Sequence, residues 1–161
     1  MSTIFKGNTV SFRKVDNFDK LPVEAAKKIL YEELVPACEA KGVKLSFYGN
    51  HAGHGSIENV DDYNQRKANG DLFDVKRVQK AYSSIPIITK NTSNYKRGSY
   101  GLKHVFESHP SQSKYLRNGD LIAAMLVDGH QARFGKRTET LTVNCEFKVD
   151  VKKEELKKSY P

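Results

Sequence analysis

Side chains suited to proton transfer and phosphate binding gather in one short segment, NYKRGSYGLKHVFESHP, which spans residues 94 to 110. A cation beside a phenol or an imidazole lowers the partner's pKa, and an imidazole exchanges protons near neutral pH. The segment therefore admits three interpretations: an active site, a surface that binds phosphate, or the basic face of an ordinary helix.

Periodicity predicts an amphipathic helix from Ser99 to Ser108, with Ser99 as its cap and Pro110 just beyond its end. One side of this helix is apolar except for a histidine and consists of Leu102, Val105, Phe106 and His109. The opposite side is polar and consists of Tyr100, Lys103, His104 and Glu107. We expect the apolar side to be buried and the polar side to be solvated, with an i, i+4 ion pair between Lys103 and Glu107.

The net charge of +8 is concentrated around the same segment. Between Lys76 and Arg117 there are nine Lys or Arg residues and a single acid, Glu107. Such a localised excess attracts polyanions. The residues predicted to bind nucleic acid are Lys76, Arg77, Lys80, Lys96, Arg97, Tyr100, Lys103, Lys136 and Arg137.

Two H-x-S triplets offer a catalytic alternative, His54-Gly55-Ser56 and His109-Pro110-Ser111. They resemble the signature of two-histidine phosphoesterases. That resemblance implies one imidazole as base, the other as acid, and hydroxyls that hold the phosphate. In this alternative the catalytic residues are His54, Ser56, His109 and Ser111, and the two rings face one cleft.

The helices and strands that the sequence predicts around these candidate residues indicate an α+β fold. We expect a single domain over residues 1–150, in which short amphipathic helices cover a small, mostly antiparallel sheet, and a charged tail over 151–161. The expected helices are 19–42 (capped by Asp19 and kinked at Pro36), 61–70, 72–84, 99–108 and 118–128. The expected strands are an N-terminal hairpin around Gly7-Asn8, then 43–48, 85–89, and a hairpin over 131–149.

The order of elements from 71 to 149 resembles that of winged-helix DNA-binding domains. In this resemblance Lys136 and Arg137 lie at the wing turn, where they contact phosphate. The segment in the place of the recognition helix, GDLIAAMLVD, carries two aspartates and no Arg, Lys, Asn or Gln that could read a base edge. We therefore expect binding by charge, with stacking from Tyr95, Tyr100 or Tyr115, and little sequence readout.

The composition also argues against several classes of protein. The longest apolar run, LIAAMLV, is far shorter than a membrane span, and the first residues lack the pattern of a secretory signal. Cys38 and Cys145 lie far apart and predict neither a disulfide framework nor a zinc site. No cofactor or metal is expected, and we expect an intracellular protein.

The sequence thus favours a non-enzymatic, basic protein that associates with nucleic acid, or a small structural component of a nucleoprotein particle. The first alternative is the two-histidine phosphoesterase, and the second is an interaction module for an acidic protein.

Overall fold

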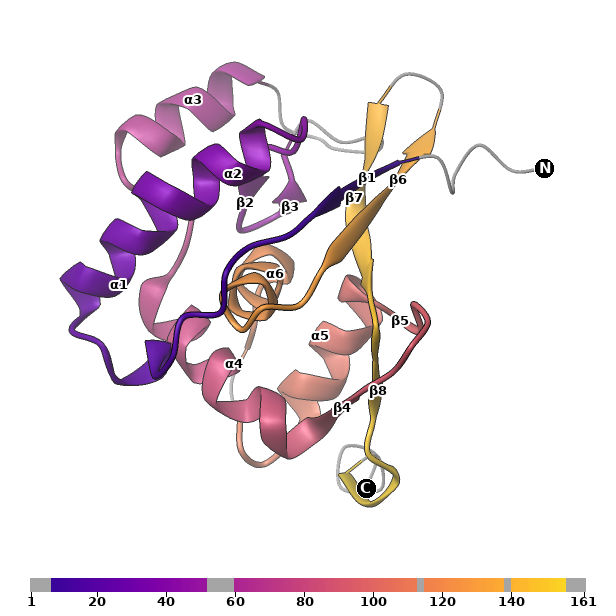
Figure 1. Ribbon diagram of the computed structural model, residues 1–161. Helices are drawn as coiled ribbons and strands as arrows, with labels where there is room; N and C mark the ends of the chain where they lie inside the picture. The colour runs from indigo at the N-terminus through magenta and orange to yellow at the C-terminus, as the bar shows by residue number, and fades with distance from the viewer. Residues whose placement is uncertain (1–6, 52–59, 113–114, 138–139, 156–161) are drawn as a thin grey trace.

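The computed structural model describes residues 7–51, 60–112, 115–137 and 140–155, which form one α+β domain (Figure 1). Its main sheet has four antiparallel strands in the order β1-β6-β7-β5. These strands are β1 (Asn8–Val10), β6 (Ala132–Arg137), β7 (Thr140–Phe147) and β5 (Arg97–Gly98). The predicted fold class is confirmed.

Two smaller strand pairs complete the β-structure. β2 (Leu45–Ser46) pairs with β3 (Gly49–Asn50), and β4 (Thr89–Asn91) pairs with β8 (Val149–Val151). β8 follows β7 directly and continues its course in Figure 1. The N-terminal strand pairs with β6, and the first half of the hairpin predicted there lies outside the described residues.

The helix predicted over 19–42 runs from α1 (Val23–Ile29) through a π-helical turn, η3 (Leu30–Leu34), into α2 (Val35–Glu39). Asp19 is not its cap, because it lies in a preceding 3₁₀ turn, η2 (Phe18–Lys20), and Pro22 takes the cap position. The π-helical turn lies directly before Pro36, whose ring removes one helical N–H. Gly42 ends the helix with φ +79°, as predicted.

The prediction of a strand over 85–89 is wrong. Helix α4 (Val75–Ile88) continues through Pro86 to Ile88, and only then does β4 begin. Ile85 and Ile88 are buried on the inner side of this helix, whereas Pro86 and Ile87 are exposed. Burial of one helical face therefore outweighs the strand preference of the β-branched residues.

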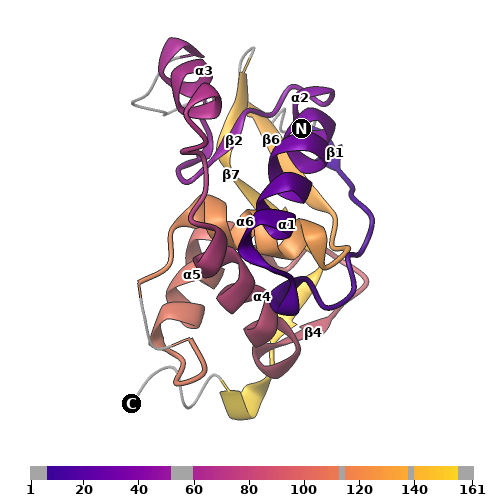
Figure 2. The same ribbon diagram turned by 90° about the vertical axis from the view of Figure 1, so that its left-hand side faces the viewer.

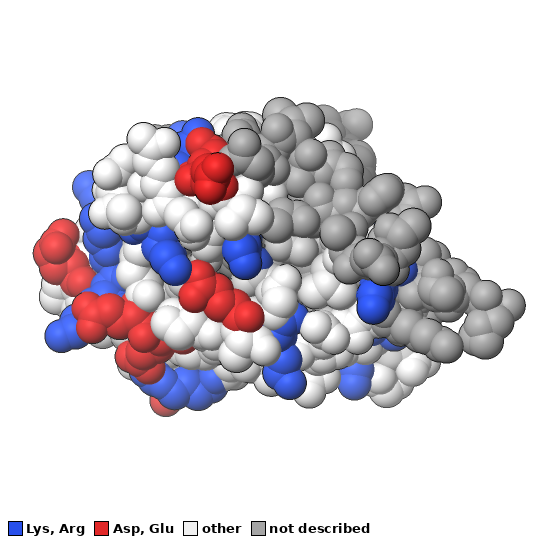
Figure 3. Space-filling view, turned by 90° about the horizontal axis from the view of Figure 1, so that it is seen from above, with Lys and Arg blue, Asp and Glu red and all other residues white. Residues whose placement is uncertain are grey.

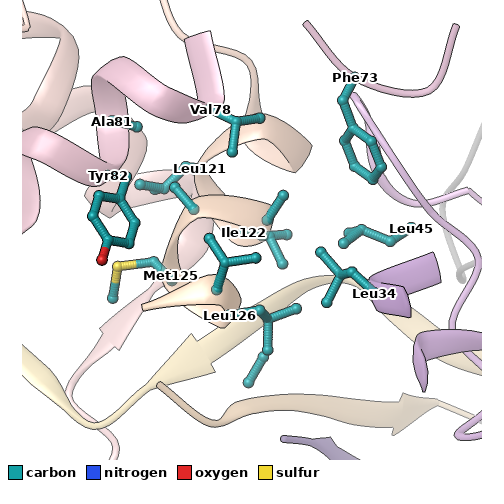
Figure 4. Packing of buried hydrophobic residues seen from close by; sticks show 14 of the residues in the cluster. Leu34, Leu45, Phe73, Val78, Ala81, Tyr82, Leu121, Ile122, Met125 and Leu126 are labelled. Carbon is teal, nitrogen blue, oxygen red and sulfur yellow. The ribbon is translucent and has the colours of Figure 1, made fainter. Parts of the chain in front are cut away.

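The remaining helices are α3 (Val60–Ala68), α5 (Ser99–Ser108) and α6 (Asn118–Val127). All residues of α6 are buried, and it lies at the centre of the fold, behind α1 in the view of Figure 2. Figure 4 shows its side chains directed toward α4 on one side and toward Leu34 and Leu45 on the other. A helix that is apolar on every face belongs in a core.

The winged-helix element order is therefore wrong at several points. The expected first strand is helical, and β4 pairs with β8 outside the main sheet. The segment in the place of the recognition helix is α6, which has no exposed face to enter a groove. The strand β6 also extends through Arg137, so Lys136 and Arg137 belong to the ladder and not to the turn.

Candidate functional site

A cleft of about 620 Å³ opens where four segments meet. These segments are the first half of α5, residues 115–118 that lead into α6, the turn between β2 and β3, and the middle of β7. The residues that line it are Phe47, Tyr48, Tyr100, Lys103, Tyr115, Arg117, Asn118, Val143 and Asn144. Its volume lies within the range of about 300–1,000 Å³ that is typical of ligand sites.

Two tyrosine rings of this cleft are unusually exposed. Tyr100 is 54% exposed and Tyr115 is 61% exposed. Tyr100 lies on the side of α5 opposite Leu102 and Phe106, which are fully buried as predicted. Because the core anchors the inner side of α5, the opposite side presents a phenol ring to solvent.

A cation lies beside both rings. The ammonium of Lys103 is 5.5 Å from the ring centre of Tyr100 and 5.3 Å from that of Tyr115. The guanidinium of Arg77, on α4, lies 5.4 Å from the Tyr115 ring. At these distances a cation is attracted to the face of an aromatic ring. Each of the two tyrosine rings therefore contacts at least one cation.

The ion pair of Lys103 is present, but the prediction that it is solvated is wrong. Lys103 is only 7% exposed, and its Nζ donates to Glu107 Oε1 at 3.0 Å. Glu107 Oε2 also accepts from the backbone N–H of Leu116 at 2.8 Å, which ties residues 115–117 to α5. Burial opposes ionisation of Glu107, but these hydrogen bonds hold its pKa below the usual value.

The second half of the cleft is formed around Phe47. Its ring centre lies close to two guanidinium groups, that of Arg66 at 4.8 Å and that of Arg117 at 5.1 Å. Arg117 is held in turn by Asp120, whose Oδ2 accepts from Nε at 2.7 Å. Asp120 is fully buried and also accepts from the backbone N–H of Asp74. Burial raises the pKa of Asp120 to about 6, although the Arg117 bond acts in the opposite direction.

Asn118 joins the two halves of the cleft. Its Nδ2 donates to the carbonyl of Tyr48 and to Asn144 Oδ1, at 3.0 and 2.8 Å. Its Oδ1 is buried and has no partner within the described part of the chain. The next residue must be glycine, because a Cβ at Gly119 would lie 1.5 Å from the carbonyl oxygen of Ser46. This close approach brings the β2–β3 turn against the start of α6.

The nine residues predicted to bind nucleic acid do not form one surface. Tyr100 and Lys103 lie in the cleft and Arg77 lies beside Tyr115, whereas Lys136 is near the far end of the β6–β7 ladder. Lys136 pairs with Leu141, and Arg97 pairs with Phe147. Leu141 and Phe147 are six positions apart on β7, which corresponds to about 20 Å at 3.3–3.4 Å per residue. The side chain of Arg137 lies outside the described residues.

Acidic residues from other parts of the chain neutralise several of these cations. Arg77 pairs with Asp74, and Arg97 pairs with Asp150 at 2.8 Å. Within the described residues, Lys76, Lys80 and Lys96 make no ion pair. On the face seen from above, Figure 3 shows Lys and Arg side chains lying among Asp and Glu side chains. The local excess in the sequence is therefore partly balanced in the fold.

His109 is a buried anchor at the end of α5. Its Nε2 lies 2.7 Å from Glu155 Oε1, and its Nδ1 accepts from the backbone N–H of Ser111 at 3.0 Å. The Ser111 hydroxyl also contacts this ring and donates to Ser84. Both ring nitrogens are thus engaged within the protein. His54 and Ser56, the other half of the two-histidine alternative, lie outside the described residues.

A second histidine cluster is not predicted by the sequence patterns. His51 Nδ1 lies 2.5 Å from Ser46 Oγ, and His51 Nε2 lies 2.8 Å from Asp62 Oδ2. Hydroxyl, imidazole and carboxylate occur in this order in hydrolases. Here Ser46 and His51 are fully buried, and Ser46 Oγ also accepts from the N–H of Tyr48. The chain of bonds therefore fixes the β2–β3 turn, which carries Phe47, against α3.

The cleft residues on the β2–β3 turn and on β7 are also absent from the predicted site. A signal is present in Phe47-Tyr48, an aromatic pair beside a glycine, and in Tyr115-Leu116-Arg117-Asn118. Only the tertiary fold shows that these two segments meet.

Within the described residues no group of His, Cys, Asp and Glu is arranged to hold a metal ion. No helix in the same residues is long and apolar enough to cross a membrane.

Comparisons of the chain with known protein families, with curated proteins and with solved structures find no match in any of the three.

Proposed function

We propose that this protein is a non-enzymatic nucleic-acid-binding protein that takes an unpaired strand in the cleft, with little sequence readout. The observation that carries the proposal is the pairing of exposed Tyr100 and Tyr115 with the buried ammonium of Lys103. Proteins that bind single strands combine aromatic rings, on which bases stack, with cations that follow the backbone. A role in a nucleoprotein particle would use the same surface.

The distribution of charge supports the same ligand. The net charge of +8 favours a polyanion, and Lys76 and Lys80 lie on α4, the helix whose Arg77 contacts Tyr115. Two exposed tyrosines suit a base better than they suit the carboxylates of an acidic protein, because every base has a π-face. Because α6 is buried, it cannot enter a duplex groove as the recognition helix of a winged-helix domain does.

Equilibrium binding to labelled single-stranded oligonucleotides tests the stacking part of the proposal. We expect the double variant Tyr100→Ala/Tyr115→Ala to bind at least about thirtyfold more weakly, since stacking contributes about 1–3 kcal/mol per base and two rings are removed. Ile87→Ala is the matched control, because Ile87 is also exposed (45%) but does not line the cleft. Equal affinity of the double variant and the control would refute the proposal.

Salt dependence tests the part of the proposal that concerns charge. Reversal of Lys76 and Lys80 to Glu removes cations that have no ion-pair partner in the described residues. We expect the affinity for unrelated nucleic-acid sequences to fall by a similar factor. We also expect the slope of log affinity against log salt concentration to be smaller by about 0.7 for each phosphate that is no longer neutralised. Arg97 and Lys103 are unsuitable for this test, because a carboxylate there would face Asp150 or Glu107. An unchanged slope would show that these lysines do not contact phosphate.

A further inference from the structure

We infer that the strand continues from the cleft across β7 into a second hollow, so that the ligand is a single strand of several nucleotides. The inference rests on the proposed function and adds a second subsite to it. The hollow has a volume of about 230 Å³ and lies along β5, β6 and β7. Asn144 borders both the cleft and the hollow, and they therefore adjoin at this residue of β7.

A glycine of β5 leaves room in this hollow. Gly98 has φ −79° and ψ 152°, which any L-residue adopts, so the backbone does not require glycine here. A Cβ at this position would meet only the carbonyl oxygen of Cys145, at an ordinary 3.8 Å. A larger side chain would therefore be compatible with the fold at this position and would occupy the hollow.

The rim of the hollow repeats the combination of ring and cation found in the cleft. Arg133 lines the hollow, and its guanidinium lies 4.0 Å from the ring centre of Tyr95. The ammonium of Lys148 lies 5.2 Å from the same ring. Glu146, which also lines the hollow, accepts from Arg133 at 2.7 Å and holds this guanidinium in place. A planar guanidinium on a ring offers a surface on which a base stacks.

The spacing of the two sites sets the length of the ligand. Tyr95 and Tyr100 are five residues apart along a segment that includes β5, so they are separated by at most about 17 Å. A stacked strand advances about 3.4 Å for each nucleotide. About five stacked nucleotides are therefore enough to reach from one tyrosine to the other.

The test is a length series with two variants that fill the hollow. Labelled oligothymidylates and oligouridylates, from two to about twelve nucleotides, are titrated into the wild type, Gly98→Val and the milder Gly98→Ala. Gly101→Ala is the control, since nothing lies within 4 Å of a Cβ at Gly101 on α5. Melting temperatures establish that each variant is folded, and the two oligonucleotide series distinguish DNA from RNA.

We expect Gly98→Val to weaken binding of oligonucleotides longer than about five nucleotides by roughly tenfold, and Gly98→Ala by less. Dinucleotide binding stays unchanged in both variants and in the control. Equal binding of every length by wild type and Gly98→Val would overturn the second subsite and leave the cleft intact. Failure of the wild type to bind any oligonucleotide would overturn the proposed function itself. Perturbation of the backbone amide signals of Gly98 and Glu146 by long but not short oligonucleotides supports the inference independently of the variants.

Discussion

The two ends of helix α5 show how similar residues come to have different roles. Near its start, Tyr100 and His104 are about half exposed, and Lys103 lies beneath two aromatic rings. At its end, His109 is buried and both of its ring nitrogens have partners in the protein. Composition does not distinguish these ends, because each offers an imidazole and a hydroxyl group.

The two ends of α5 differ in the segments that pack against them. Residues 153–155 follow β8 and bring Glu155 to His109, whereas the start of α5 borders the open cleft. Buried polar groups with all partners supplied stabilise a fold, and exposed rings beside cations remain available to a ligand. The end of α5 therefore stabilises the fold, and its start carries the proposed binding site.

The largest effect is expected on the inner side of this helix. Phe106 is fully buried, so Phe106→Ala should lower the free energy of unfolding by about 3–5 kcal/mol. Urea denaturation of wild type and variant measures this difference. An unchanged denaturation midpoint would mean that the helix is rotated about its axis relative to this structure.

His109→Ala should reduce stability by about 3 kcal/mol, because it removes a buried imidazole together with its hydrogen bonds to Glu155 and Ser111. His104→Ala is the matched control, since its side chain is half exposed and should change stability by less than about 0.5 kcal/mol. Thermal denaturation of both variants measures the contrast. Equal stability of the two variants would remove the distinction between the ends of α5.

The ionisation of Asp120, which holds Arg117 of the cleft, makes the stability of the fold depend on pH. The pKa of this buried carboxyl is raised to about 6 in the folded protein, so the folded state holds the proton more tightly than the unfolded chain. Its contribution to stability is complete below about pH 4 and diminishes as the pH rises through about 6. The decrease amounts to about 2–3 kcal/mol, since each pKa unit corresponds to about 1.4 kcal/mol.

Asp120→Asn removes this ionisation and isolates its contribution from that of the other carboxyl groups. We expect the stability of the wild type relative to the variant to fall between about pH 4 and pH 7. Urea denaturation at several pH values measures the change. A constant difference across this range would show that Asp120 is ionised throughout.

The smallest effect on stability is expected in the cleft. Tyr100→Ala should change the free energy of unfolding by about 0.5 kcal/mol or less, since the ring is 54% exposed. Thermal denaturation measures this change alongside the two histidine variants. A decrease comparable to that of His109→Ala would give Tyr100 a structural role and would weaken the comparison between the two ends.

Local patterns predict much of this fold. The apolar spacing of α5 correctly identifies its buried face, and Gly42 is correctly identified as a helix end. The pattern fails at residues 85–88, where β-branched residues continue a helix because its inner face is buried against the core. Local preference and tertiary packing conflict there.

The site is less predictable, because its parts come from distant segments. Tyr100 and Lys103 are predicted from the sequence, but Phe47 reaches the cleft through the close approach at Gly119. Asn144 joins the cleft from β7 through its hydrogen bond with Asn118. The burial of Lys103 depends on residues 115–117, which are held by the Leu116–Glu107 hydrogen bond. The close approach at Gly119 and the Leu116–Glu107 hydrogen bond join distant segments, and no periodic pattern in the sequence predicts them.

The most direct test of the central claim is an NMR titration that follows the ring protons of Tyr100 and Tyr115 as a single-stranded oligonucleotide is added. Stacking of bases should shift both sets of signals upfield, with much smaller changes at Tyr63, whose ring is fully buried. The shifts should saturate with the affinity obtained from equilibrium binding. Binding that leaves the ring signals of Tyr100 and Tyr115 unchanged would contradict the account.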